Sequence, residues 1–382
     1  MLWRERAAEF ADEVVAPLGM LLHRMAPAAV TAGFAPLPEF IELATSEGFT
    51  RLTDTIADGG GGLSREAEYE VLETLAAADA GLADMLTGIP LPMRLARRGP
   101  LQLRRRLTAT VRKASRAQQG GCICAAGGRP LQLCRDGAGW RLNGSAPDAP
   151  GGVVATHAVI GCTAGRGCAD MMVAVVALDR AGVWRQPLTP SPGLRGRIAA
   201  RLVFDHVRLE PDEVLGEQHG GDRVAASLRT IADLSAAIGC IGVARAAYDG
   251  ADRWRAERGL EAGRRLARMR GELETAREAV RTVHAAEYAR LDAAEAMSAP
   301  HGMRVRALAS RTAISLARSA SALCGAEAAG EDGVSYLDGT RFHPLKLLRD
   351  ATAGSPPRPD RSRPVAATAA HPQPTGSIQW AT

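Results

Sequence analysis

The stretch from Gly139 to Gly152, GWRLNGSAPDAPGG, is a candidate ligand-binding loop. Its first half reads as a strand that ends at Gly144, and a glycine at the end of a strand lets the backbone approach a ligand closely. Its second half contains two prolines, which have no backbone N–H, and Ser145 is its only hydroxyl side chain. The stretch therefore has the outline of a ligand loop but few groups that could hold a ligand.

Three further patterns could carry chemistry, and each also has a plainer interpretation. Cys122 and Cys124 lack the second pair that a zinc site needs. The glycines at 59–62 lack the strand and the spacing of a phosphate-binding loop, which favours a flexible connection. The basic run at 94–113 is typical of a solvated helix face, with an anionic ligand or partner as the alternative.

The composition indicates a soluble, globular, cytoplasmic protein. At 382 residues with 46% hydrophobic residues, the chain can bury a large core in two or three domains. Aromatic residues are only 4%, and none lies among the clustered arginines, which argues against nucleic-acid binding. The seven cysteines are odd in number and are interpreted as reduced thiols. We expect no targeting signal and no transmembrane helix, because no apolar run reaches about 18 residues.

The residue pattern changes twice along the chain and predicts an α+β multidomain fold. Apolar residues recur at helical spacing first, as in Phe10, Val14 and Leu18, then at a period of two, and then at helical spacing again. We expect an α-helical domain, a β-barrel or sandwich and an antiparallel four-helix bundle. The predicted boundaries are 1–118 for the N-terminal α-helical domain, 119–221 for the middle β domain, 222–352 for the bundle and 353–382 for a disordered Pro/Arg-rich tail.

Within these domains, the pattern also predicts individual elements. Ser64 is the expected N-cap of a helix that has Glu66 and Glu68 in its first turn. Three long amphipathic helices are expected after residue 222, and a shorter one carries residues 345–348. The strand candidates are 122–126, 131–135, 140–143, 158–163, 171–178 and 199–209.

Several stretches resemble the acyl-CoA dehydrogenase superfamily. Residues 73–81 match the phrase E-x-x-A-x-x-D-A-G, and 139–144 read GWRLNG, close to a phrase of the family's middle domain. RLVFDHVRLEPDEVLGE at 201–217 resembles the passage that leaves that domain, and PLKLLRDATA at 344–353 resembles the last bundle helix. The resemblance implies the three-domain fold, bound FAD and the α,β-desaturation of an acyl thioester, in which a carboxylate takes the α proton and flavin takes a hydride.

The resemblance also assigns cofactor positions. The Trp and Thr that flank the flavin ring in the family fall on Asp148 and Pro150. Gly127 and Gly128 could offer backbone N–H groups to a pyrophosphate, or form a plain turn. Two positions correspond to segments that reach a neighbouring subunit's flavin: Arg258, with a surface arginine as the alternative, and Gly325.

The family's usual catalytic Glu has no counterpart in this sequence. The segment after the R-D phrase is TAGSPPRPDRSRP, which contains no Glu. Some members carry the base early in the first long bundle helix, where this chain has Arg229. The nearest acid is Asp233, which is the candidate base, with an ordinary helix carboxylate as the alternative.

Three functions remain open, and the resemblance favours the first. The first is a divergent FAD-dependent acyl-CoA dehydrogenase, and the second is a flavin-dependent monooxygenase of the same fold. The third is a flavin-free relative, either a non-redox enzyme acting on a carrier-bound acyl chain or a partner subunit that keeps only the scaffold. The expected partners are an acyl-CoA or carrier-protein-bound substrate, and an electron-transfer flavoprotein or flavin reductase if flavin is bound. The apolar stripe at 236–247 leads us to expect a homo-oligomer, either a dimer or a tetramer.

Overall fold

The computed structural model describes residues 2–25, 36–56, 59–92, 101–103, 105, 121–124, 131–164, 170–189, 194–216, 220–293 and 295–324. The predicted helix at 345–348 and the predicted tail at 353–382 lie outside these residues, and the domain boundaries stay predictions. The described residues form helices, then a sheet, then helices again, so the predicted fold class is confirmed.

The N-terminal layer is helical, and two of its helices begin at residues whose side chains cap them. Ser64 caps α5 as expected, with its Oγ accepting from the Ala67 N–H at 3.3 Å. Asp79 caps α6 and accepts from the N–H groups of Gly81 and Leu82. The helices are α1 (Leu2–Phe10), a π-helical turn (Ala11–Val15), α2 (Ala16–Arg24), α4 (Pro36–Ser46), α5 (Arg65–Ala78) and α6 (Ala80–Gly88).

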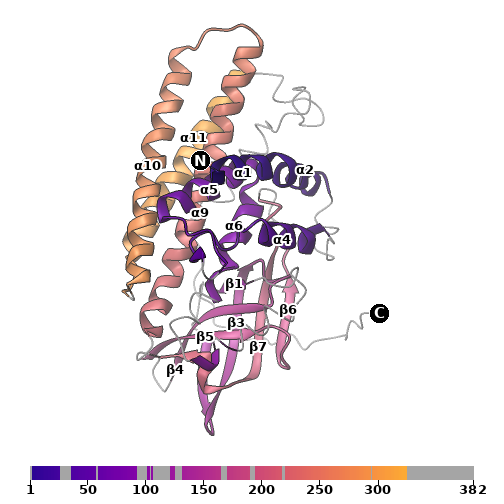
Figure 1. The fold of residues 1–382 in the computed structure, drawn as a ribbon, viewed down its shortest axis with the longest axis vertical. Helices are drawn as coiled ribbons and strands as arrows, with labels where there is room; N and C mark the ends of the chain where they lie inside the picture. The colour runs from indigo at the N-terminus through magenta and orange to yellow at the C-terminus, as the bar shows by residue number, and fades with distance from the viewer. Residues whose placement is uncertain are drawn as a thin grey trace, which may run out of the picture.

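The middle domain is one mixed sheet, which Figure 1 shows below the N-terminal helices. The strand order is β6-β7-β3-β2-β4-β5-β8, and β1 pairs in parallel with β4. The sheet encloses a core made of its own buried side chains, including Leu142, Ile160 and Phe204, so it curls around that core as a barrel-like layer. The strands are β1 (Gly121–Cys124), β2 (Leu131–Asp136), β3 (Gly139–Pro150), β4 (His157–Ala164), β5 (Asp170–Ala177), β6 (Val183–Pro187), β7 (Ala199–Leu209) and β8 (Val214–Leu215).

Strand β3 is much longer than the strand predicted at 140–143. It continues through the stretch expected to be a loop and pairs with β7 as far as Pro150. The pairing register shifts between Ala146 and Ala149, so Pro147 lies in the irregular part of the ladder, where its missing N–H costs no regular hydrogen bond. The prediction of a loop was therefore wrong because a bulge accommodates the proline.

The C-terminal helices run along one side of the molecule in Figure 1 and are α9 (Gly221–Glu257), α10 (Arg264–Asp292) and α11 (Ala299–Cys324). Helix α9 contacts α5, α6, α11 and β5, and thus joins all three layers. One 18-residue window of α9 is apolar enough to cross a membrane by composition, but 72% of that window is buried inside the protein. Its apolarity is that of a core helix.

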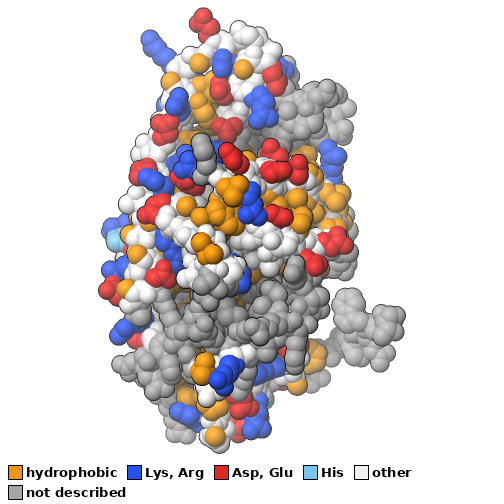
Figure 2. Space-filling model, in the orientation of Figure 1, with side chains coloured by type: hydrophobic (Ala, Val, Ile, Leu, Met, Phe, Trp, Pro, Cys, Tyr) orange, Lys and Arg blue, Asp and Glu red, His pale blue; other side chains and the backbone are white. Residues whose placement is uncertain are grey.

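The apolar stripe of α9 is not a free surface for assembly. Ile238, Ile241, Val243 and Ala247 are all buried within the chain. Figure 2 instead shows hydrophobic side chains gathered over the N-terminal helices on the face drawn. Leu2, Leu21 and Leu43, which belong to these helices, are large apolar residues that remain exposed. Homo-oligomer formation stays a prediction.

His157, the first residue of β4, gives an expected dependence of stability on pH. Burial lowers the pKa of His157, because the charged ring is poorly solvated there. The unfolded chain then binds a proton near pH 6.5 while the folded chain stays neutral, so stability falls as the pH drops below about 6.5. We expect His157→Gln to reduce this loss relative to the wild type, measured by urea unfolding at pH 7.5 and pH 5. His206→Gln is the control, because the His206 side chain is 67% exposed. If His157→Gln lost as much stability between pH 7.5 and pH 5 as the wild type, the assignment of this loss to His157 would be wrong.

Candidate functional site

The candidate site lies where the β domain meets α6 and α9, and Asp148 of β3 is its first member. Its carboxylate receives two hydrogen bonds from Arg197, one to each oxygen, at 3.1 and 2.9 Å. This bidentate arrangement fixes both groups in one plane. The residue at the predicted ring-flanking position is therefore held by a neighbouring guanidinium.

Arg197 joins the β domain to the N-terminal helices. Its Nε donates to Asp84 of α6 at 2.9 Å, while its other two nitrogens bind Asp148. Gly196 makes this approach possible, because a Cβ there would lie 2.6 Å from the Asp79 carboxylate. The neighbouring Arg195 binds the backbone oxygens of His23 and Met25 at 2.7 and 2.6 Å. The segment before β7 is thus anchored to the helical layer.

The network continues from Asp84 into the bundle. Ser235 of α9 donates a short hydrogen bond to Asp84, and its Oγ lies 2.9 Å from the Thr87 Oγ1. Burial alone would lower the pKa of Arg197, but the carboxylates of Asp84 and Asp148 outweigh it and raise that pKa. Arg197 therefore stays protonated between its two carboxylates and links three parts of the fold.

Pro150 is the second predicted ring-flanking residue. It ends β3 and pairs with Ala199 of β7. Proline offers neither an N–H nor a hydroxyl, and Asp148 offers a carboxylate whose oxygens are both bound to Arg197. Asp148 and Pro150 therefore supply neither the aromatic cover nor the hydroxyl donor that the resemblance places beside a flavin ring.

Asp233 lies on α9 but faces away from this junction. Its side chain is 1% exposed and accepts from Arg306 of α11 at 2.7 Å and from Arg229 at 3.4 Å. Asp233 and Ser235 are two positions apart, so they lie on different sides of the helix. The structure brings Asp148 and Asp84 together through Arg197 but leaves Asp233 in a separate ion pair. Its role as a general base stays a prediction.

The remaining predicted cofactor contacts are placed elsewhere or lie outside the described residues. Arg258 ends α9, where its guanidinium covers the Trp254 ring at 4.5 Å and donates to the Trp254 carbonyl at 3.4 Å. Gly127, Gly128 and Gly325 lie outside the described residues. A cofactor contact from any of these four residues stays a prediction.

Three cysteines agree with the expectation of reduced thiols. Cys134, Cys162 and Cys240 form no disulfide. Burial raises the pKa of the Cys162 and Cys240 thiols to about 12, so neither forms a thiolate at neutral pH. Among the residues that the structure describes, no group of three or more metal-ligating side chains comes together.

Sequence reasoning did not find Arg197, Asp84 or Ser235. Arg197 is one of many arginines, and it lies 49 residues from Asp148 and 113 from Asp84. The one usable signal was the acid at Asp148, because the resemblance places an aromatic residue at that position. The sequence did not indicate which arginine would pair with it.

No protein-family model matches the chain, and no curated protein sequence matches it either. Several solved structures, in contrast, are similar to the chain. A glutaryl-coenzyme A dehydrogenase in complex with glutaryl-CoA has a TM-score of 0.72 and 18% identity over 92% of this chain and 89% of that one. A glutaryl-CoA dehydrogenase from Mycobacterium smegmatis in complex with FADH2 has a TM-score of 0.67 and 17% identity over 92% and 88%.

A third match is FkbI, described as serving the biosynthesis of the methoxymalonyl extender unit of the polyketide immunosuppressant FK520. It has a TM-score of 0.67 and 19% identity over 90% of this chain and 94% of that one. Matches that cover both chains almost completely confirm the three-layer architecture, while identities below one fifth leave the chemistry open. The chain therefore has the acyl-CoA dehydrogenase fold.

Proposed function

We propose that the chain is a flavin-free acyl-thioester-binding protein built on the acyl-CoA dehydrogenase scaffold, and that it acts as a partner subunit. The observation that carries this proposal is the Asp148–Arg197–Asp84 bridge. One of its members, Asp148, is the residue that the resemblance assigns beside the flavin ring, and the groups of the bridge satisfy each other's charge and hydrogen bonds. A neighbour in complex with glutaryl-CoA supports an acyl thioester as the ligand class.

The acid–base chemistry of the described residues supports a binding role. α,β-Desaturation needs a carboxylate that is free to take a proton. Asp233 is held by Arg306 and Arg229, and Asp84 is held by Arg197 and Ser235. A carboxylate whose oxygens already accept hydrogen bonds from arginine or serine has fewer lone pairs left to take a substrate proton. Neither acid is prepared for proton abstraction.

A second candidate is the FAD-dependent oxidation of an acyl thioester, and the neighbour in complex with FADH2 favours it. Bound FAD would supply the hydride acceptor. The segments that contain Gly127, Gly128 and Gly325 would hold its phosphates through backbone groups. Electron-transfer flavoprotein or flavin reductase becomes a partner only in this case. The monooxygenase alternative would also require flavin and stays a prediction.

Visible absorption and calorimetry separate these functions. We expect the purified protein to be colourless and to remain so after incubation with excess FAD and desalting. We also expect it to bind glutaryl-CoA or acetyl-CoA more tightly than free coenzyme A. Stoichiometric yellow flavin after desalting would overturn the flavin-free proposal and favour the dehydrogenase. Equal affinity for the thioesters and for free coenzyme A would overturn acyl-thioester recognition.

A further inference from the structure

A small cavity lies between the N-terminal helices and the bundle, where α5, α6, α9 and α10 meet. Its volume is about 20 Å³. Apolar side chains, including Leu72, Leu86 and Ile238, form much of its wall. Polar side chains also line it: His284 and Glu68 from one pair of helices, and Thr87 and Ser235 from the other pair.

His284 is the unusual residue of this wall. It is 1% exposed, and neither of its ring nitrogens has a hydrogen-bond partner in the protein. The nearest carboxylate oxygen, Oε2 of Glu68, is 3.5 Å from Nε2, which is at the outer limit for a hydrogen bond. A buried polar atom without a partner is costly, so such atoms in native proteins are usually satisfied by an ordered water.

Hydroxyl groups face the same cavity from α6 and α9. Thr87 donates to the backbone oxygen of Asp84 at 2.8 Å, and its Oγ1 also lies 2.9 Å from the Ser235 Oγ. Ser235 in turn donates to the Asp84 carboxylate. A hydroxyl oxygen can accept as well as donate, so both side chains keep capacity for a further hydrogen bond.

The volume decides what this cavity can hold. A buried water needs roughly 10–15 Å³ and two to four polar partners. The cavity offers about 20 Å³ together with the ring nitrogens of His284 and the hydroxyls of Thr87 and Ser235. An acyl chain or a sugar does not fit in that space, whereas one water molecule does.

We infer that the cavity binds a single water molecule that joins His284 to the hydroxyls of Thr87 and Ser235. The bound water completes a hydrogen-bonded path from His284, through Ser235, to Asp84 at the domain junction. The imidazole ring of His284 has two nitrogens, so it can form a hydrogen bond to the water through one of them. This site is independent of whether the junction binds flavin or an acyl thioester.

A high-resolution crystal structure tests the site directly. We expect one ordered water at hydrogen-bond distance, about 2.7–3.2 Å, from a ring nitrogen of His284. In Thr87→Val, which keeps the shape of the side chain but removes the hydroxyl, that water should be lost or displaced. An empty cavity, or a direct hydrogen bond between His284 and Glu68 with no water, would overturn the proposal.

Nuclear magnetic resonance of the ¹⁵N-labelled histidine rings gives a second test in solution. Thr87→Val should shift the ring nitrogen signals of His284, which are assigned by their loss in His284→Gln. Thr74→Val is the matched control, because Thr74 bonds to the Glu70 carbonyl and to Arg245 and does not line the cavity. Identical His284 signals in the wild type and Thr87→Val, or equal shifts in both valine variants, would count against the water bridge.

Discussion

Replacing Asp233 with Asn is expected to lower the free energy of unfolding by about 3 kcal/mol, because it removes one partner of a buried ion pair. The Asp233 carboxylate is 1% exposed, and the Arg306 side chain that binds it is 18% exposed. Without the carboxylate, the guanidinium of Arg306 remains at the contact between α9 and α11 with no counter-charge. Urea unfolding at pH 7 measures the change.

The outcome also tests the predicted role of Asp233 as a general base. Asp252→Asn is the control, since Asp252 forms an ion pair with Arg255 on the same helix but is 42% exposed. Its effect should be much smaller, because exposed ion pairs contribute little. A stable Asp233→Asn variant that binds acyl-CoA normally but has lost turnover would contradict the structural role and favour catalysis.

Several helices and strands of this fold could be predicted from the arrangement of apolar residues along the chain. Strand β7 matches the predicted strand because its buried and exposed residues partly alternate, as in a half-buried strand. Strands β4 and β5 lie close to the predicted strands because each is a short, nearly continuous apolar run of strand length. Strand β3 was cut short in the prediction, since Pro147 and Pro150 usually end a strand. Whether a proline lies at a bulge depends on the register with β7, which is a tertiary property.

The candidate site could be predicted only in part. The resemblance pointed to Asp148 and Pro150 as the anomalous positions, and the structure shows what the acid does there. Arg197 was not predicted, because its partners are far away in the sequence and the residues next to it show no pattern that indicates a pairing across domains. His284 was missed for a related reason: a single histidine on a helix is ordinary until its burial and its missing partners are seen.

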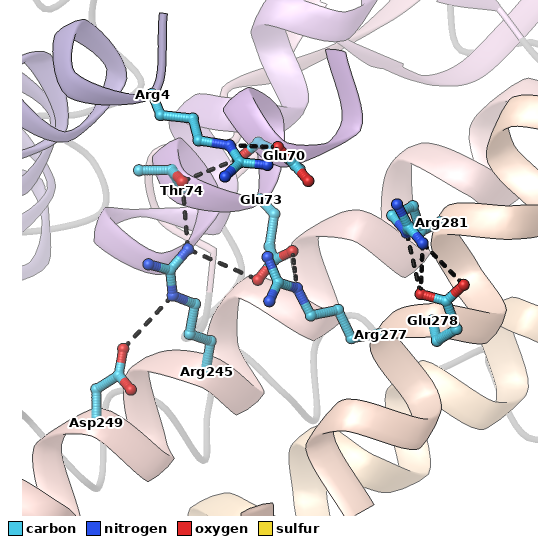
Figure 3. Close-up of polar contacts among 9 residues, drawn as sticks. All are labelled: Arg4, Glu70, Glu73, Thr74, Arg245, Asp249, Arg277, Glu278 and Arg281. Carbon is cyan, nitrogen blue, oxygen red and sulfur yellow. Dashed lines mark hydrogen bonds and ion pairs between the residues drawn. The ribbon is translucent and has the colours of Figure 1, made fainter. Parts of the chain in front are cut away.

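The second large effect is expected at Glu73, in the polar cluster of Figure 3. This carboxylate of α5 is fully buried, and Arg277 of α10 donates to it at 2.7 Å while Arg245 of α9 lies 3.6 Å away. One carboxylate thus holds two helices of the bundle against the N-terminal layer. Glu73→Gln keeps the size of the side chain but leaves both guanidinium groups without that charge. We expect a loss of about 3 kcal/mol in the free energy of unfolding.

Glu278→Gln is the matched control, because Glu278 is paired with Arg281 on the surface of α10 in the same view. Its charge is solvated whether or not the pair forms, so no measurable change in stability is expected. The side chains of Arg245 and Arg277, which pair with Glu73, are 35% and 43% exposed, so water can partly solvate their charges in Glu73→Gln. The loss in the free energy of unfolding should therefore not exceed the usual range for a buried ion pair. Equal stability of Glu73→Gln and Glu278→Gln would show that solvent replaces the carboxylate completely, and the expected role of Glu73 in holding α5 to the bundle would be wrong.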